Sequence, residues 1–332
     1  MTAAVLEGLG AMVPPRVVTN EDLSRTLDTT DEWIRTRTGI GTRHWAGTGV
    51  STGDLAVVAG ERALKSAGTP AIDMVVLATS TPDHPCPATA PEVSAKLGLG
   101  DIPAFDVAAV CAGFVYALST AAGAIATGQA ERVLVIGADT WSTRINPADR
   151  GTAVIFGDGA GAMVLRAGEP DEPGALAGFD LGSDGTGKEL VGIPAGGSRQ
   201  RSTKTPPLES DSYLYMHGKE VFTHAVNRMA NSSSRLLDRL GWSTGGIDWF
   251  VGHQANARIL HAIADLLDVD HERVVLNLDR VGNTSAASIP LAMADAAGAG
   301  RFAVGDRLLL TAFGAGLVWG SAALRWPDLT VG

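Results

Sequence analysis

The sequence predicts an α/β protein assembled from two similar halves. Two observations support this. Short apolar runs alternate with Ala-rich stretches of helical period, and the same series of segments returns 175 residues later. The AAGA at 121–124 returns at 296–299, and ERVLVIG at 131–137 returns as DRLLLTA at 306–312. Because this period is far longer than that of solenoid repeats, it indicates a duplicated domain.

We expect the two halves to comprise residues 1–175 and 176–332. In each half, strands buried on both faces are indicated by apolar runs bounded by Gly or Asp, such as 133–136 and 308–310. An Ala-rich helix is expected before each of these strands. Two such halves usually share a site between them.

A short helix is expected near the N-terminus. Thr29 and Glu32 have the spacing of a capping box, and Gly39 has the position of a C-terminal cap. Farther along, residues 181–212 are rich in Gly, Ser, Thr and Pro, which predicts an irregular insertion before a helix that begins near Gly218.

Composition excludes several classes of protein. The chain has 332 residues, of which 45% are hydrophobic, so it can bury a sizeable core and is not disordered. Its net charge of −10 argues against nucleic acid as the main partner. Two cysteines, neither in a zinc-like cluster, predict no disulfide framework and no metal site, and they suit a cytoplasmic protein. Neither an export signal nor a membrane span is apparent.

Cys111 is the first candidate for chemistry. The strand-like run 105–110 leads into an Ala-rich helix that starts at or next to the cysteine. A helix N-terminus stabilises a thiolate, so we expect a lowered pKa and a nucleophilic sulfur. The alternative is a buried cysteine that serves only as a small hydrophobic side chain.

His253 and Asn283 are the other candidates. His253 follows the apolar run 249–252, at the end of a strand, where α/β proteins place their sites. Asn283 precedes a helix opened by Thr284 or Ser285, where an asparagine can also serve only as a cap or turn residue. The 175-residue shift pairs Cys111 with Ala286, so a pseudo-twofold axis would bring both helix starts to one point, with His253 beside them.

Five motifs give the sequence its family resemblance: DEWIRTRTGI (31–40), FDVAAVCAGF (105–114), DRGTAVIFGDGAGA (149–162), HQAN (253–256) and GNTSAASIPLA (282–292). Along essentially its whole length the chain resembles β-ketoacyl-acyl-carrier-protein synthase III, the initiating condensing enzyme of the thiolase superfamily. This resemblance implies a duplicated five-layer αβαβα thiolase fold and a catalytic triad of Cys111, His253 and Asn283.

The same resemblance implies the reaction. Cys111 would take an acyl group from an acyl-CoA, with an oxyanion hole formed by the N–H groups of Cys111 and Ala315. A malonyl-acyl-carrier-protein thioester would then lose CO2, and its enolate would be stabilised by His253 and Asn283 before attacking the acyl-cysteine. The product would initiate fatty-acid or polyketide synthesis, with coenzyme A thioesters as substrates and no permanently bound cofactor.

Binding residues also follow from the resemblance, in two sets. The CoA contacts are implied to be Trp33, Arg37, Arg150 and Asn256, and the acyl-pocket residues Cys86, Trp141, Phe156 and Phe313. Because Cys86 stands where acetyl-preferring members often carry phenylalanine while Trp141 is larger than usual, we expect a reshaped pocket and a short branched or other unusual starter.

The partners implied are an acidic carrier protein and a second copy of this chain. Arg258 is kept for carrier docking, but Asp265, Leu266 and Thr223 replace frequent basic residues. Attraction for an acidic carrier should therefore be weaker, and we expect a dedicated carrier of a specialised pathway. Members of the superfamily pair through the sheet of the first half. We therefore expect a homodimer in which the Cys86 loop reaches the neighbouring pocket.

Other protein classes share part of this set of residues. A papain-like protease has the same order of Cys, His and Asn, but the sequence around its cysteine differs. A degradative or biosynthetic thiolase needs a second active-site cysteine, and plant-type polyketide synthases are longer. An acyltransferase that moves the acyl group from Cys111 to an alcohol, an amine or a carrier remains the principal alternative. A binding module with a vestigial triad is disfavoured because the triad and the CoA set occur together.

Overall fold

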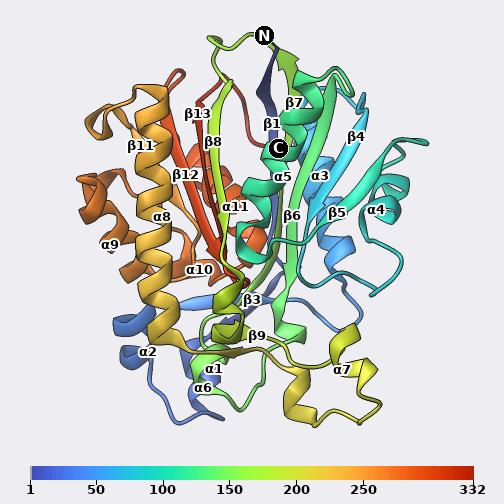
Figure 1. Cartoon of the computed structure of the whole chain (residues 1–332), viewed down its shortest axis with the longest axis vertical. Helices are drawn as coiled ribbons and strands as arrows, with labels where there is room; N and C mark the ends of the chain where they lie inside the picture. Colours follow the sequence, from blue (N-terminus) through green and yellow to red (C-terminus); the bar gives the residue numbers. More distant parts are fainter. Residues whose placement is uncertain (1) are drawn as a thin grey trace.

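The structure, a computed structural model, describes residues 2–332. Its core consists of two sheets with a pair of helices between them (Figure 1). The first sheet has the strand order β1 (Ala3–Met12), β7 (Asp158–Gly168), β6 (Arg132–Thr140), β4 (Met74–Ala78) and β5 (Ala104–Val107). The second has the order β8 (Leu176–Ser183), β13 (Val318–Arg325), β12 (Arg307–Gly314) and β11 (Trp249–Gly252).

Helices form the central layer and the two outer layers. The central helices α5 (Gly113–Ala126) and α11 (Ser288–Gly298) contact both sheets. The outer face of the first sheet is covered by α3 (Thr52–Ala67) and α4 (Ala90–Lys96), and that of the second by α8 (Gly218–Leu240) and α9 (Ala257–Leu267). The layers therefore follow the order αβαβα, as expected.

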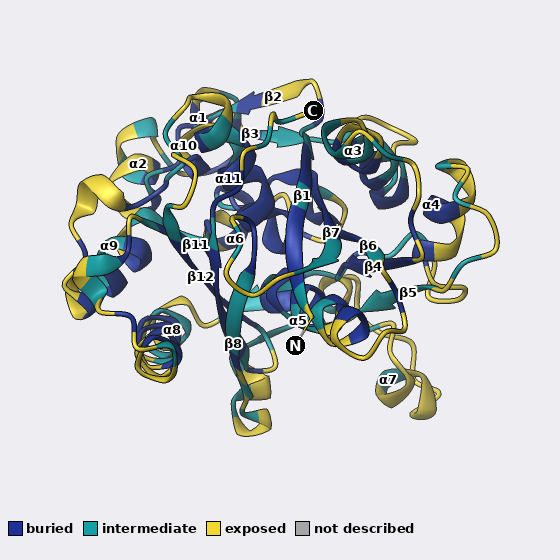
Figure 2. Cartoon of the chain, turned by 90° about the horizontal axis from the view of Figure 1, so that it is seen from above, coloured by how far each residue is buried: buried dark blue, intermediate teal, exposed yellow. Residues whose placement is uncertain are grey.

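The remaining elements lie at one end of the layers, at the bottom of Figure 1. They are the paired strands β2 (Arg16–Thr19) and β3 (Thr42–Trp45), the paired strands β9 (Val191–Gly192) and β10 (Tyr215–Met216), and the short helices α1 (Asn20–Ser24), α2 (Asp31–Thr38), α6 (Arg150–Ala153), α7 (Ser198–Ser202) and α10 (Leu278–Val281). Figure 2 shows α7 exposed, whereas α11 is buried in the middle of the molecule.

The duplication is visible in the backbone. In both sheets the strand that follows the central helix pairs in parallel with an earlier strand of its own half, β6 with β4 and β12 with β11. Each central helix is preceded by a 3₁₀ turn, Val110–Ala112 or Ser285–Ala287, and the first residue of each turn has a positive φ, 48° at Val110 and 53° at Ser285. The limits of the two halves, residues 1–175 and 176–332, stay a prediction.

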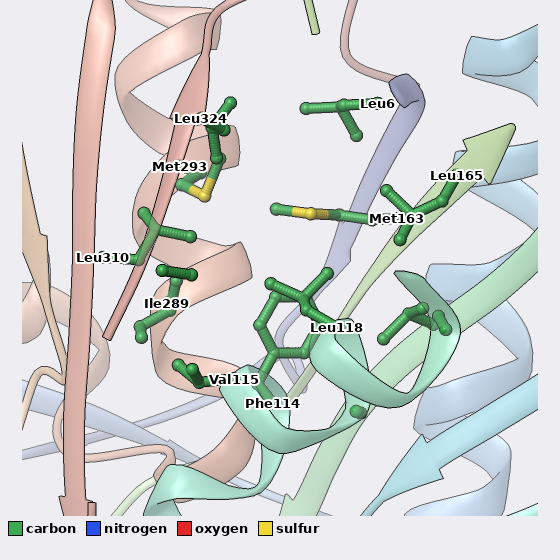
Figure 3. Close-up of a cluster of buried hydrophobic side chains, with 14 of the residues drawn as sticks. Leu6, Phe114, Val115, Leu118, Met163, Leu165, Ile289, Met293, Leu310 and Leu324 are labelled. Atoms are coloured by element: carbon green, nitrogen blue, oxygen red, sulfur yellow. The ribbon is translucent and has the colours of Figure 1, made fainter. Parts of the chain in front are cut away.

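The central core explains why the halves stay together. Apolar side chains from both halves meet between the sheets (Figure 3), among them Phe114 and Leu118 of α5, Met163 of β7 and Met293 of α11. All four are almost completely buried. Burial of such side chains stabilises a fold by about 1.5–3 kcal/mol each, so neither half is expected to be stable without the other.

Two sequence predictions need correction. Helix α2 ends at Gly39, as predicted, but its N-terminal cap is Thr30 and not Thr29, because the Thr30 hydroxyl accepts the hydrogen bond from Trp33 N. The expected cap of the second central helix by Thr284 or Ser285 is also absent: α11 begins at Ser288 with no side-chain cap.

Candidate active site

Cys111, His253 and Asn283 line one cavity of about 280 Å³. Cys111 lies in the 3₁₀ turn before α5, His253 directly after β11, and Asn283 in the loop before α11. The three residues therefore come from both halves and meet where the two central helices begin.

Backbone hydrogen bonds hold Asn283 in place. Its N–H donates to Ile155 O and its carbonyl accepts from Gly157 N, both at 2.9 Å. Its side-chain oxygen accepts from Ser285 N at 2.9 Å. Because the amide oxygen is occupied in this way, the NH2 group is left to donate into the cavity.

His253 is neutral in this environment. Its side chain is 4% exposed, and burial lowers its pKa to about 4. The Nδ1 atom lies 2.7 Å from the hydroxyl oxygen of Ser288, while its backbone N–H donates to Thr311 O at 2.8 Å. A neutral imidazole fixed through Nδ1 can act as a hydrogen-bond donor at Nε2 without carrying charge.

The expectation of a lowered pKa at Cys111 is wrong for the resting protein. Although the residue keeps some surface open to the cavity, burial raises the pKa of its thiol to about 12. The hydrogen bond from Ser285 lowers this pKa, and the nearby Asp139 raises it further. Desolvation outweighs the start of the helix here, so the sulfur holds its proton until it attacks a substrate.

Asp139 is a fully buried carboxylate between the two halves. One of its oxygens accepts from the N–H groups of Ser80 and Thr81, and the other accepts from Ala286 N at 3.1 Å. Ala286 is the duplicate of Cys111, so the backbone N–H that corresponds to that of the nucleophile is occupied by a carboxylate of the protein itself. Burial raises the pKa of Asp139.

The end of β12 and the residue after it close the cavity beside the nucleophile. Phe313, Gly314 and Ala315 all line it. A Cβ at Gly314 would lie 2.9 Å from Cys111 N and 3.2 Å from Ala112 N, so glycine allows the two backbones to approach closely. This contact brings the expected oxyanion-hole residues, Cys111 and Ala315, to the same cavity.

The other predicted pocket residues divide into two groups. Trp141 and Phe156 line the cavity, with ring centroids 5.3 Å apart. Cys86 is exposed and does not line the cavity of its own chain.

Sequence reasoning missed the wall contributed by the irregular insertion, the segment between it and α8, and α8 itself. Its residues are apolar, and they are Val191, Ile193, Leu214, Met216, Val221, Ala225 and Met229. The signal for the first four was their apolar character within an otherwise polar stretch, which is typical of side chains that turn inward. This wall makes the cavity mainly apolar, and the predicted irregular insertion contains the short elements β9 and α7.

The predicted CoA contacts lie together at helix α2. The guanidinium groups of Arg37 and Arg150 lie 4.7 and 4.8 Å from the centre of the Trp33 ring. Asn256 caps α9 through its side-chain oxygen and donates from Nδ2 to the carbonyl of Arg37 at 2.9 Å. One aromatic face and two cations thus lie together, an arrangement suited to a nucleotide with phosphates.

Arg258, the predicted carrier contact, is exposed and lies over the ring of Phe222 at 5.7 Å. Thr223 and Asp265 are exposed as well, and Leu266 is 60% exposed. Across residues 2–332, no helix combines the length and apolar character that a bilayer span requires.

Comparisons with known proteins identify the family of the chain. The family model described as 3-oxoacyl-[acyl-carrier-protein] synthase III matches residues 105–185, and the model of its C-terminal part matches residues 237–326. A β-ketoacyl-[acyl-carrier-protein] synthase III of Streptomyces coelicolor is 62% identical over 328 residues, which is 99% of this chain and 98% of that protein.

Solved structures also resemble this chain. The crystal structure of 3-oxoacyl-(acyl carrier protein) synthase III from Pseudomonas aeruginosa has a TM-score of 0.93 and 50% identity, with 99% of each chain covered. The priming β-ketosynthase of the R1128 polyketide pathway has a TM-score of 0.91 and 34% identity, covering 98% of this chain and 97% of its own. Because the likeness extends over both halves and includes the cavity where they meet, the chain is an acyltransferase with a thiolase fold that belongs to the β-ketoacyl-[acyl-carrier-protein] synthase III family.

Proposed function

We propose that this protein condenses an acyl-CoA with a malonyl-acyl-carrier-protein thioester, with loss of CO2, to initiate a fatty-acid or polyketide chain. The observation that carries the proposal is that Cys111, His253 and Asn283 line one largely apolar cavity. It holds a nucleophile and two neutral hydrogen-bond donors but no charged base.

In the first half-reaction Cys111 attacks the thioester carbon of the acyl-CoA. The carbonyl oxygen becomes an oxyanion that accepts hydrogen bonds from the N–H groups of Cys111 and Ala315, and each such donor typically changes the rate by about 10²-fold to 10³-fold. The bond to the CoA sulfur then breaks. CoA leaves as the thiol, so that the proton of Cys111 ends on the departing sulfur.

In the second half-reaction the malonyl thioester loses its carboxylate as CO2. The electron pair of the broken C–C bond forms an enolate, whose oxygen accepts hydrogen bonds from His253 Nε2 and Asn283 Nδ2. The enolate carbon attacks the acyl-cysteine, and Cys111 leaves as a thiolate that takes up one proton from solvent. An apolar cavity solvates the malonyl carboxylate poorly and so favours its loss as CO2. The two neutral donors then stabilise the negative charge that moves to the enolate oxygen.

The acyl-CoA would bind with its adenine against Trp33 and its phosphates near Arg37 and Arg150. The pantetheine arm would pass Asn256 toward the cavity. CoA thioesters are thus substrates of the enzyme. At the far end the acyl group would contact Trp141, Phe156 and Phe313, and this reshaped wall supports a short branched or other unusual starter.

A homodimer would complete this pocket. Strand β5 is the edge of its sheet, and Phe105 on it is 37% exposed, which is unusual for a large apolar side chain. Pairing through this edge would cover Phe105 and carry the exposed Cys86 of one chain toward the pocket of the other. The carrier would dock near Arg258, on a face whose positive charge is reduced by Asp265.

The proposal is tested by intact mass measurement after incubation with mixed acyl-CoAs, followed by malonyl-carrier protein. We expect one acyl adduct on Cys111, which disappears with release of CO2 and formation of a β-ketoacyl-carrier. Transfer of the acyl group to the carrier or to an alcohol or amine, without release of CO2, would instead indicate the plain acyltransferase. kcat/KM across a starter series would reject the unusual starter if acetyl-CoA were strongly preferred.

A further inference from the structure

Two buried serines at the start of α11 contact the catalytic candidates. Ser285 is 0% and Ser288 is 1% exposed, so neither side chain has access to bulk water. Ser285 lies two residues after Asn283 in the motif GNTSAAS, and Ser288 is the first residue of the helix. Buried hydroxyls are expected to have specific partners, and these two reach different residues of the triad.

Ser285 reaches the nucleophile. Its hydroxyl donates to Cys111 Sγ at 3.4 Å, and within residues 2–332 this is the one side-chain hydrogen bond that the sulfur receives. A thiolate formed in this buried position lacks water, so a donor on the sulfur stabilises it directly. The contact requires the positive φ of 53° at Ser285, a conformation that serine rarely adopts.

Ser288 reaches the imidazole. Its hydroxyl oxygen lies 2.7 Å from His253 Nδ1 and accepts from Gln254 N at 3.4 Å. A hydroxyl donates one hydrogen, and when that hydrogen is directed at Nδ1 it fixes the hydrogen of the neutral ring on Nε2, the nitrogen left for the cavity.

We propose that the two serines serve different steps: Ser285 is a catalytic residue that stabilises negative charge on the sulfur of Cys111, and Ser288 is a positioning residue that keeps His253 in the Nε2–H tautomer for formation of the enolate. This inference rests on the proposed function. In acylation the sulfur of Cys111 bonds to the acyl carbon, CoA leaves with the thiol proton, and the Ser285 hydroxyl donates throughout without losing its hydrogen.

The test of Ser285 is the rate at which iodoacetamide alkylates Cys111 in the full-length protein, which needs no substrate. We expect Ser285→Ala to slow alkylation and acyl-CoA loading by about 10-fold to 100-fold, the worth of one hydrogen bond to a charged group. Release of CO2 from malonyl-carrier by pre-acylated enzyme, which precedes departure of the Cys111 sulfur, should change less than about threefold. Ser285→Thr keeps the hydroxyl, and Val110 shows that the duplicate turn accepts a β-branched residue, so its rates should stay near those of the wild type.

Should Ser285→Ala fold poorly, Ser285→Gly removes the hydroxyl at a backbone conformation that glycine favours. Unchanged alkylation in both variants would overturn the role of Ser285. An equal loss of loading and CO2 release would also overturn it, because Ser285 N holds Asn283 and that result would indicate a displaced turn.

The test of Ser288 is the tautomer of His253, read from the ¹⁵N chemical shifts of the labelled imidazole. In the wild type we expect hydrogen on Nε2, and in Ser288→Ala a mixture of tautomers with condensation slowed about 10-fold and alkylation of Cys111 unchanged. Ser288→Thr should restore the wild-type shifts. An unchanged tautomer in Ser288→Ala would contradict the assignment even if the wild type proved not to condense, so this result is separate from failure of the proposed function.

Discussion

At the scale of single residues, burial governs the two groups that titrate in the cavity. It raises the pKa of Cys111 to about 12 and lowers that of His253 to about 4, so both are neutral near pH 7. A neutral pair avoids the cost of burying charge in an apolar cavity and develops charge only as bonds change. The neutral thiol of Cys111 and the neutral imidazole of His253 can therefore wait in the cavity until a substrate binds.

The imidazole makes stability depend on pH. Above pH 6.5 both the folded and unfolded states hold a neutral His253, which then contributes nothing to the pH dependence. Between pH 6.5 and about 4 only the unfolded state takes up the proton. The free energy of unfolding should therefore decrease as the pH is lowered through this range, by about 3 kcal/mol in all. Denaturant unfolding at pH 7, 6 and 5 should show a steeper fall for the wild type than for His253→Gln. Parallel curves would contradict this.

Trp33 gives a second prediction at this scale. Trp33→Ala removes the aromatic face next to Arg37 and Arg150, so the KM for acyl-CoA should rise about 10-fold while kcat changes little, because binding far from the sulfur is lost equally in ground and transition states. Steady-state kinetics with acyl-CoA as the varied substrate measure this. A fall in kcat with unchanged KM would show that Trp33 does not bind CoA.

The residues that sequence reasoning could identify were those with a motif. Positions at the ends of strands and the starts of helices predict Cys111, His253 and Asn283 as candidates, and all three line the cavity. The thiol pKa could not be predicted, because it depends on desolvation by residues far away in the sequence. Thr29 and Thr30 could not be told apart, because either threonine can cap the same helix.

At the scale of elements, close contact between backbones fixes the site. Gly137 of β6 lies so near the turn before α11 that a Cβ would come within 2.4 Å of Ala286 O. A backbone atom cannot swing aside as a side chain can. Strand β6 of the first half therefore holds the turn that carries Ser285 in the second half.

Exchange of Gly137 for alanine tests this contact. We expect Gly137→Ala to cost at least about 1–3 kcal/mol of stability, as overpacking does, and to lower the condensation rate. Gly123→Ala is the matched control: Gly123 lies inside α5 with open space around it, so alanine should stabilise the protein by about 0.5–1 kcal/mol. Thermal unfolding of both variants provides the measurement, and similar effects would refute the role of Gly137.

Elements with regular periodicity were predicted well. The apolar runs at 133–136 and 308–310 lie in β6 and β12, and the long helix after the insertion begins at Gly218 as expected. The sequence does not predict the cavity wall formed by Val191 and Leu214. Segments this short show no periodic pattern, so contacts with the rest of the protein decide which of their side chains point inward.

At the scale of the whole molecule, charge is the property that bears on the carrier. The chain has 36 acidic and 26 basic residues, and Asp265 adds negative charge to the helix that begins next to Arg258. An acidic carrier should therefore associate slowly with this face.

Asp265→Lys should lower the KM for an acidic acyl-carrier protein about 3-fold to 10-fold at low ionic strength. The gain should fade above about 0.5 M salt, where the Debye length is a few ångströms. The KM for acyl-CoA serves as the internal control and should not change. If the carrier KM did not respond at any salt concentration, docking would not involve this helix.

Dimerisation gives the last prediction. Phe105→Lys places a charge on the edge strand β5, so sedimentation equilibrium should show a dimer for the wild type and weaker association for the variant. The intact cavity within each chain means that alkylation of Cys111 should persist. Undiminished association of the variant would exclude β5 from the interface.

The turn Ser285–Ala287, which duplicates the turn that carries Cys111, limits how many acyl groups one chain can hold. Asp139 already accepts from Ala286 N, and alanine stands where the other half has its sulfur, so the internal symmetry cannot create a second reaction centre. Titration with radiolabelled acyl-CoA should accordingly saturate at one label per polypeptide, and a dimer should carry two.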